Sequence, residues 1–200
     1  MRNLRLQAET SHALAIGYDW VHDALTEADR AAIEAGVLRN GILPYLAAIG
    51  RPDGNPWARS DWNWNQVVNG GMLTAALAFA DADRVADAAA TTLGNATAAL
   101  RLAFGSYGPD GAWPEGAGYW GYGTRYALTA ATSLIAATGG DRGLIEHGVG
   151  FNVTGTFCIY HMGPAGDAHT VFNWADAEES PCEGSNLLQL GALFPSTAVK

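Results

Sequence analysis

The sequence predicts an all-α fold built from antiparallel helical hairpins. Apolar residues recur at helical spacing through most of the first 138 residues, and few stretches before residue 150 alternate as a strand would. Glycines and prolines mark the ends of these periodic stretches. Long hairpins with glycine-rich ends suit an α/α toroid, in which helix pairs surround a central cleft. A plain helical bundle or an α-solenoid would show the same periodicity.

The first 47 residues predict two helices. Residues 4–24 carry apolar side chains at mostly helical spacing. The tetrapeptide Thr26–Asp29 places a hydroxyl three residues before an acidic side chain, which is close to a capping box and predicts the start of a second helix. That helix is expected to continue to about Ala47 with an interruption near Pro44, because proline has no amide hydrogen to donate.

A loop and a second hairpin follow. Residues 50–56 read Gly-Arg-Pro-Asp-Gly-Asn-Pro and predict a loop. Either Ser60 or Asp61 is expected to cap a helix that continues through Ala80. The alanine-rich residues 83–104 predict its antiparallel partner.

The last third of the chain changes character. A helix is predicted over about residues 117–138, ending at the glycine pair 139–140. Residues 151–178 mix aromatic side chains with glycines and polar residues, which favours an irregular segment near 150–180 with short extended pieces. A final helix is predicted near residues 185–194 and ends at Pro195.

The composition limits the classes of partner. Two hundred residues with 48% hydrophobic content suit one domain or a large part of one. The formal net charge of −9 argues against nucleic acid, because phosphate binding needs clustered Lys and Arg. The same negative charge would repel an acidic polysaccharide, so an enzyme that acts on one would need basic groups in its site. The sequence contains no run of 18 apolar residues, so it predicts no membrane-spanning helix.

Cysteines and histidines give weaker information. Cys158 and Cys182 could pair, but two cysteines decide neither the bond nor the compartment, which stays unassigned. The N-terminus lacks the apolar stretch of a secretion signal. The five histidines are scattered and no C-x-x-C or H-E-x-x-H spacing occurs, so neither a metal ion nor a cofactor is expected.

Two runs of unusual composition carry the functional signal. Residues 61–71, DWNWNQVVNGG, are rich in amides and indoles, and residues 110–126, DGAWPEGAGYWGYGTRY, combine one turn, one glutamate and three tyrosines. Tyr119, Tyr122 and Tyr126 are spaced three and four apart, so they share one face of a helix. The buried face of a helix usually carries aliphatic side chains, whereas tyrosines among glycines indicate a surface that lines a ligand-binding cleft.

These runs resemble the heparinase II/III-like family of polysaccharide lyases. The resemblance is carried by Trp62–Asn65 with the pair Gly70–Gly71, by residues 110–119, and by the order and separation of these motifs. The stretch Phe172–Ala177, FNWADA, is also similar to one that follows the helical hairpins in that family. The glycine pair itself has two interpretations: close packing against a neighbouring helix, which is favoured, or room for a sugar ring.

The resemblance implies a site for β-elimination next to a uronic acid. In the family an Asn or His of the first run and a Tyr of the second run act together. Asn65 would donate to the uronate carboxylate, and Tyr119 would remove the C5 proton and protonate the bridging oxygen. Asn63 is the competing choice for the amide, because both amides flank Trp64. The expected partner is an acidic polysaccharide or oligosaccharide, and the particular uronate polymer stays open.

The resemblance also bears on domain organisation. It covers about residues 10–195 and implies that residues 1–200 form a single, incomplete α/α-toroid domain without the family's C-terminal β-sandwich. That β-sandwich often supplies a histidine that assists the tyrosine. We expect this histidine to be missing and the isolated chain to have little activity, unless His161 or His169 takes its place.

Further substrate contacts are expected from side chains of the two runs: Asn63, Trp64, Trp113, Glu115, Tyr122 and Arg125. Indoles stack on the apolar faces of sugars, and packing in the core is the alternative. Glu115 could instead cap the helix that follows it, because the helix macrodipole favours a carboxylate there. Arg125 could pair with a neighbouring acidic residue. The residue types favour these structural roles in both cases.

Two other classes of function stay open. On the same architecture, a glycoside hydrolase would use Glu115 as general acid with Asp61, Asp110 or Asp176 as its partner. A non-catalytic carbohydrate-binding domain would keep the aromatic side chains without proton transfer. The products of a digestion separate the three classes, since only elimination leaves an unsaturated uronate.

Overall fold

The all-α prediction is confirmed by the computed structural model, which describes residues 4–51, 56, 58–163, 170–177 and 181–196. The α-helices are α1 (Leu4–Val21), α2 (Glu27–Val37), α3 (Leu43–Ile49), α4 (Asn63–Ala78), α5 (Ala86–Gly105), α6 (Ala117–Thr138), α7 (Thr154–Tyr160) and α8 (Gly184–Leu193). Shorter helical turns are η1 (His22–Ala24), η2 (Leu38–Ile42), η3 (Ile145–His147) and η4 (Phe151–Val153). Within the described ranges, extended pairing is limited to isolated bridges.

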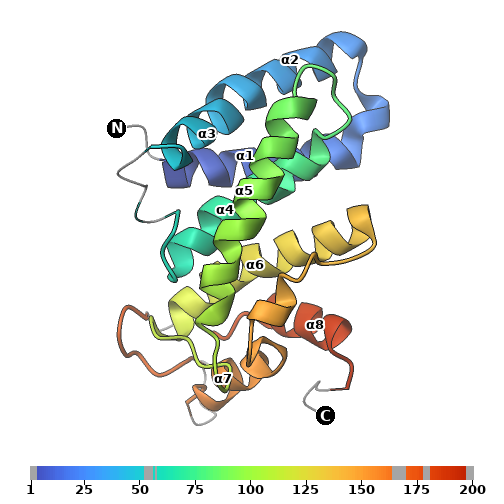
Figure 1. Cartoon of the computed structure of the whole chain (residues 1–200). Helices are drawn as coiled ribbons and strands as arrows, with labels where there is room; N and C mark the ends of the chain where they lie inside the picture. Colours follow the sequence, from blue (N-terminus) through green and yellow to red (C-terminus); the bar gives the residue numbers. More distant parts are fainter. Residues whose placement is uncertain (1–3, 52–55, 57, 164–169, 178–180, 197–200) are drawn as a thin grey trace.

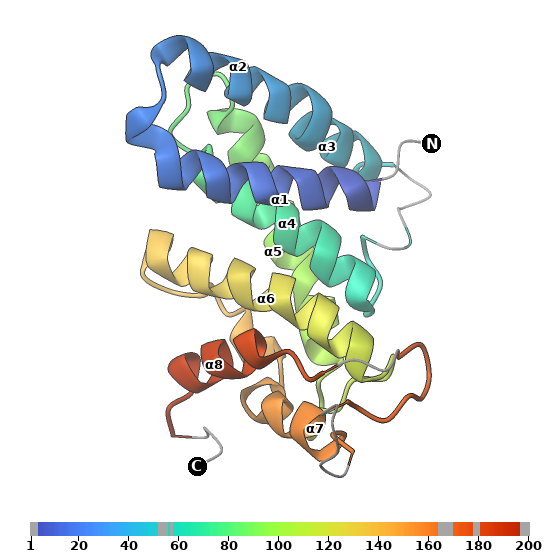
Figure 2. The same ribbon diagram turned by 180° about the vertical axis from the view of Figure 1, so that it is seen from behind.

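Helix α4 lies at the centre of the arrangement. It packs against α1, α5 and α6, and these three helices cover it from different sides (Figure 1). Helices α2 and α3 lie beyond α1 at one end of the molecule, whereas α7 and α8 lie beyond α6 at the other end (Figure 2). The core therefore forms around α4 rather than between two separate layers.

The burial of α4 follows from its sequence. Thirteen of its sixteen residues are buried, although several of these carry amide side chains. A helix that is buried on every side has no polar face toward water, so its polar groups must find partners within the protein.

The pair Gly70–Gly71 lets two helices approach α4 closely, which confirms the packing interpretation. A Cβ atom at Gly70 would lie 2.8 Å from the carbonyl oxygen of Tyr126 on α6. A Cβ atom at Gly71 would lie 2.8 Å from the carbonyl oxygen of Ala8 on α1. Real Cβ atoms do not approach backbone oxygen so closely, so each glycine is required by its neighbouring helix.

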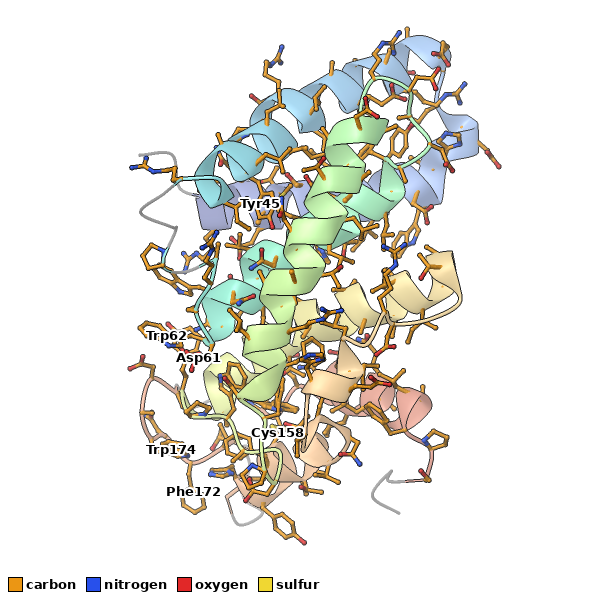
Figure 3. All side chains as sticks on the ribbon, in the orientation of Figure 1. Tyr45, Asp61, Trp62, Cys158, Phe172 and Trp174 are labelled. Carbon is orange, nitrogen blue, oxygen red and sulfur yellow. A yellow bond between two sulfur atoms is a disulfide. The ribbon has the colours of Figure 1, made fainter. Side chains whose placement is uncertain are left out.

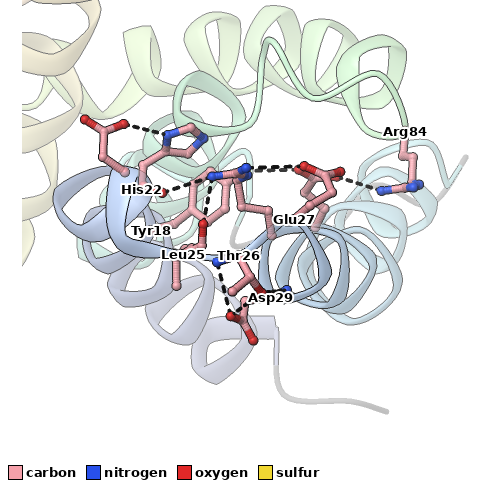
Figure 4. Close-up of polar contacts among 10 residues, drawn as sticks. Tyr18, His22, Leu25, Thr26, Glu27, Asp29 and Arg84 are labelled. Atoms are coloured by element: carbon pink, nitrogen blue, oxygen red, sulfur yellow. Dashed lines mark hydrogen bonds and ion pairs between the residues drawn. The ribbon is translucent and has the colours of Figure 1, made fainter.

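The capping box at the start of α2 is also confirmed. The Thr26 hydroxyl accepts a hydrogen bond from the Asp29 N–H at 3.2 Å, and the Asp29 carboxylate accepts one from the Thr26 N–H at 3.2 Å (Figure 4). Nearby, the buried Glu34 of α2 accepts from the Tyr18 hydroxyl at 3.1 Å and pairs with Arg84 at 3.3 Å. These contacts join α1, α2 and the segment before α5.

The interruption near Pro44 is present as a π-helical turn. Residues Leu38–Ile42 form this turn, and α3 follows with Pro44 in its first turn. Pro44 cannot donate to the carbonyl of Asn40 four residues earlier, so the regular α-helical pattern cannot pass through this point. The predicted second helix is therefore two α-helices, which end at Val37 and Ile49.

The predicted cap of α4 is wrong. The helix begins at Asn63, with Trp62 in the N-cap position, and neither Ser60 nor Asp61 caps it. The Asn63 N–H instead donates to the carboxylate of Glu115 at 2.8 Å. The acceptor for this N–H belongs to a residue 52 positions away in the sequence, so a local sequence pattern cannot predict the cap. Helix α4 also ends at Ala78, slightly earlier than predicted.

The remaining elements are close to their predicted ranges. Helix α6 spans the predicted residues, and Gly139 ends it in the left-handed conformation with φ 77°. Within the predicted irregular segment, η4 and α7 precede the bridges Met162–Val171 and Thr170–Pro181. Cys158 of α7 and Cys182 form a disulfide, which the sequence had left open. No described helix combines the length and the apolar character needed to cross a bilayer.

Replacement of Gly70 by alanine is expected to lower the free energy of unfolding by about 1–3 kcal/mol, because the added methyl group overpacks the contact with α6. Urea unfolding followed by circular dichroism measures the change. Gly94→Ala in α5 is the matched control, since a Cβ atom there meets no other group within 4 Å. This control should gain about 0.5–1 kcal/mol from better helix propensity. Equal effects at both positions would contradict the packing described for α4.

Loss of the disulfide is expected to lower the free energy of unfolding by about 3 kcal/mol, because Cys158 and Cys182 close a loop across a sequence separation of 24. The double variant Cys158→Ser/Cys182→Ser should melt earlier than the oxidised parent, and dithiothreitol should shift only the parent. Two free thiols in the purified, unreduced parent would contradict the pairing.

Candidate functional site

The starts of α4 and α6 are joined through Glu115. Its carboxylate accepts hydrogen bonds from the backbone N–H of Asn63 at 2.8 Å and from the Asn63 side-chain amide at 2.7 Å. The indole N–H of Trp113 donates to the same carboxylate at 3.2 Å. Glu115 therefore does act as a helix cap, but the helix that it caps is α4. The two runs singled out in the sequence meet at this carboxylate.

The third motif reaches the same place. Gly116 has φ +91°, a conformation that favours glycine, and a Cβ atom there would lie 2.7 Å from the carbonyl oxygen of Trp174. It would also lie 3.2 Å from the side chain of Ala177. The stretch Phe172–Ala177 thus packs directly on the residue that precedes α6. All three stretches that carry the family resemblance converge at one end of α4 and α6.

Asn65 does not face this site. It is fully buried, and its side-chain amide donates to the carbonyl oxygens of Ser60 at 2.5 Å and Ala99 at 2.8 Å. Its side-chain oxygen accepts from the amide of Asn69 at 2.9 Å. Both N–H groups are therefore used within the protein, and none is left for a substrate carboxylate. The expectation of an exposed amide at this position is wrong, because α4 is buried on its α5 side as well.

Buried amides continue along α4. Asn69 accepts from the Tyr45 hydroxyl at 2.8 Å and donates to the carbonyl of Ala58 at 2.9 Å. One turn earlier, the Gln66 amide donates to the Tyr107 hydroxyl at 2.7 Å. These residues were not singled out from the sequence. The signal was available, because Asn65 and Asn69 share one face of the helix while Gln66 lies on another, so amides are not confined to a single polar face.

Tyr119 lies in the first turn of α6, close to the joined helix starts. Its side chain is half-buried and packs on the hydrophobic core. Its hydroxyl makes no hydrogen bond to any described residue. Its ring centroid lies 6.5 Å from that of Tyr122, and the ring of Tyr122 lies 5.7 Å from that of Tyr126. The prediction that the three tyrosines share one face of the helix is confirmed.

The other two tyrosines are engaged by α1. The Tyr122 hydroxyl donates a short hydrogen bond to Glu9. Burial, together with this carboxylate, raises the pKa of Tyr122 above its ordinary value. Tyr126 is buried, and its ring lies 4.9 Å from the ring of His12. Of the three phenols, Tyr119 is therefore the one placed beside the three converging motifs.

Arg125 is exposed on α6 and forms no ion pair with a carboxylate of the described residues. Its guanidinium lies 5.9 Å from the ring centroid of Tyr122 and 5.8 Å from that of Tyr126. The salt bridge that the sequence favoured is thus replaced by contact with aromatic rings.

The indoles divide into two groups. Trp113 and Trp120 are fully buried, so Trp113 cannot contact a substrate in this conformation, contrary to expectation. Trp62, Trp64 and Trp174 are exposed, at 59%, 42% and 39%. Figure 3 shows Trp62 and Trp174 along the same side of the molecule, with Phe172 next to Trp174. Exposed aromatic side chains therefore surround the place where the three motifs meet.

His161 lies beside Trp174, with the two ring centroids 5.7 Å apart. Its Nδ1 atom is 2.7 Å from the carbonyl oxygen of Phe157. A carbonyl only accepts, so this contact places a proton on Nδ1 and leaves Nε2 of the neutral ring as an acceptor. His169, the other histidine considered from the sequence, lies outside the described residues.

No group of three or more His, Cys, Asp or Glu side chains within the described ranges is arranged to hold a metal ion. A scan of the chain against models of known protein families finds no matching family, and a search of curated proteins finds no match. The resemblance to the heparinase II/III-like lyases therefore stays a hypothesis carried by the motifs themselves.

Asn65→Ala is expected to lower the free energy of unfolding by about 2–4 kcal/mol, because the carbonyl groups of Ser60 and Ala99 lose a buried donor. Thermal and urea unfolding measure the loss. The exposed Asn40 on η2 gives the control variant Asn40→Ala, which should change stability by less than about 0.5 kcal/mol. A variant at position 65 as stable as the control would show that the buried amide is dispensable.

Proposed function

We propose that this chain is the helical part of a polysaccharide lyase that cleaves uronic-acid-containing polysaccharides by β-elimination. The observation that carries the proposal is the convergence of the three motifs at the starts of α4 and α6. Tyr119 lies there with its hydroxyl unengaged by any described residue. The exposed indoles around this place offer stacking surfaces for sugar rings. We further propose that the helices belong to an α/α toroid, as in the lyases that the sequence resembles.

Tyr119 is the proposed acid and base of the reaction. Its phenolate oxygen removes the proton from C5 of the uronic acid, and the bond between C4 and the bridging oxygen breaks as the C4–C5 double bond forms. The phenol then returns the proton to the departing oxygen, so the group ends in its starting state. No water enters the products, which distinguishes this step from hydrolysis.

We propose that His161 assists Tyr119. Its ring centroid lies 5.7 Å from that of Trp174, whose carbonyl oxygen lies close to Gly116, the residue that precedes α6. In this proposal, the Nε2 atom of His161 takes the hydroxyl proton of Tyr119, which leaves the phenolate that starts the reaction. Asn65 has no part in this version of the mechanism, because its amide is used within the core.

The geometry favours elimination over hydrolysis by Glu115. A general acid must present its carboxyl group to the glycosidic oxygen. Both oxygens of Glu115 already accept hydrogen bonds from Asn63, and one also accepts from the indole of Trp113. Asp110 likewise accepts from the backbone N–H of Ala112 at 3.3 Å, within its own turn.

Tyr119→Phe is expected to lower turnover by at least about 100-fold, because it removes the group that transfers the proton while the ring still packs. The purified chain is incubated with a panel of uronate polymers, and the ultraviolet absorbance of the unsaturated uronate is followed. Tyr160→Phe on α7 is the matched control, since that tyrosine is 83% exposed.

The products decide between the classes of function. New reducing ends without the unsaturated uronate would establish hydrolysis instead, and binding without either product would establish a carbohydrate-binding domain. Turnover by Tyr119→Phe at the parent rate would exclude the proton-transfer role of this tyrosine.

A further inference from the structure

The outer side of α1 carries four large apolar side chains that are exposed to solvent. Trp20 is 81% exposed, Leu6 60%, Val21 49% and Leu14 44%. Figure 2 shows α1 in front of α4, and no other labelled helix crosses in front of it in this view. A single exposed apolar side chain is ordinary, whereas several together on one helix mark a surface that another molecule covers.

These side chains form one continuous stripe on the helix. At about 3.6 residues per turn, the stripe covers an arc of about 120° around the helix axis. Its side chains are uncharged, and a Cβ atom at Gly17, within the stripe, would have no other group within 4 Å. We name this stripe the α1 face, and its residues are Leu6, Thr10, Leu14, Gly17, Trp20 and Val21.

A groove continues the α1 face toward α2. It has a volume of about 400 Å³ and lies between Leu6 and Leu14 of α1 and Ile33 and Gly36 of α2. None of the described residues that line it is charged. A Cβ atom at Gly36 would also have no other group within 4 Å. The groove therefore has room for apolar side chains of a molecule that packs on the α1 face.

Charges of opposite sign border the two ends of the α1 face. Arg5 lies next to Leu6 at the start of α1, whereas Asp19 lies in its last turn and Asp23 follows in η1. All three charged side chains are exposed. Arg5 and Asp19 are separated by about four helical turns, so they lie along the same edge of the face.

We propose that the α1 face binds a second copy of this chain, with the two α1 helices antiparallel about a two-fold axis. When this axis passes midway between Leu6 and Val21, each Leu6 lies opposite Val21 of the other copy. Arg5 of each copy then lies near Asp19 and Asp23 of the other, so opposite charges meet at both ends. A parallel arrangement would bring the Arg5 ends together and the aspartate ends together.

The charges favour a second copy over a lipid surface. A helix that lies on a membrane carries Lys and Arg beside its apolar face. The described residues of α1 and η1 offer one arginine, Arg5, against Glu9, Asp19 and Asp23. The whole chain has a formal net charge of −9.

The length of the α1 face sets the strength of the association. Leu6 and Val21 lie about 22 Å apart along the helix axis. A contact of this length is at the small end of specific protein interfaces. We therefore expect a reversible dimer with a dissociation constant in the micromolar range. Trp20 has the side-chain type that most often anchors such contacts.

The variant Gly17→Glu tests the interface with little risk to the fold. It places a charge within the α1 face, and Gly94→Glu on α5 is its matched control, because a Cβ atom at either glycine has no other group within 4 Å. Both variants replace a helical glycine with a better helix former, so circular dichroism should show that both fold. Sedimentation velocity at about 1 to 500 µM protein measures the association.

The parent and Gly94→Glu should dimerise alike. Gly17→Glu should weaken the dimer by at least about 10-fold, because its charge would lose water without gaining a partner. A parent that stays monomeric over the whole range would overturn the proposal, and so would Gly17→Glu that dimerises like the parent. Monomers that sediment with phosphatidylcholine vesicles would assign the α1 face to a lipid surface instead.

Charge reversal tests the antiparallel arrangement. Arg5→Glu alone and Asp19→Arg/Asp23→Arg together should each weaken self-association by about two- to tenfold, because each brings like charges together. An equimolar mixture of these two variants should associate at least as tightly as the parent, since opposite charges then meet at both ends. A mixture no tighter than its components would exclude the antiparallel dimer. None of these results depends on the products formed from a polysaccharide.

Discussion

The close packing of three helices around α4 is the constraint on which the rest of the structure depends. At Gly70 and Gly71 the backbones of α6 and α1 come so near that no side chain fits between them. Because α4 is then buried on all sides, the side-chain amides of Asn65, Gln66 and Asn69 donate hydrogen bonds to groups of the surrounding elements. Those hydrogen bonds and the two glycine contacts together fix the orientation of α4 about its axis.

The same constraint positions the candidate site. With α4 and α6 held side by side, their N-termini lie close enough for the single carboxylate of Glu115 to join them. Gly116 then admits the backbone of Trp174, so the irregular segment packs on the helix start that precedes Tyr119. The disulfide Cys158–Cys182 ties that segment to α7. Motifs that are far apart in sequence are therefore adjacent because of helix packing, and the tyrosine face toward α1 follows from the same arrangement.

Sequence patterns correctly predicted the helix starts, interruptions and ends that depend only on neighbouring residues. The capping box at Thr26, the interruption near Pro44 and the end of α6 at Gly139 each depend on a few neighbouring residues. The roles of Asn65 and Glu115 depend instead on partners 34 and 52 residues away. The sequence pattern around an amide is the same whether the amide faces a ligand or bonds to the carbonyl of another helix. The sequence therefore predicted that Asn65 faces a cleft, and its complete burial excludes this.

We propose that a uronate polymer reacts at the joined starts of α4 and α6. A crystal structure of the Tyr119→Phe variant with a bound uronate tetrasaccharide tests this claim most directly. The account predicts a uronic acid residue with its C5 atom facing the ring at position 119, and aromatic contacts from the exposed indoles around it. A sugar bound elsewhere on the chain, with the ring at position 119 covered by protein, would contradict it.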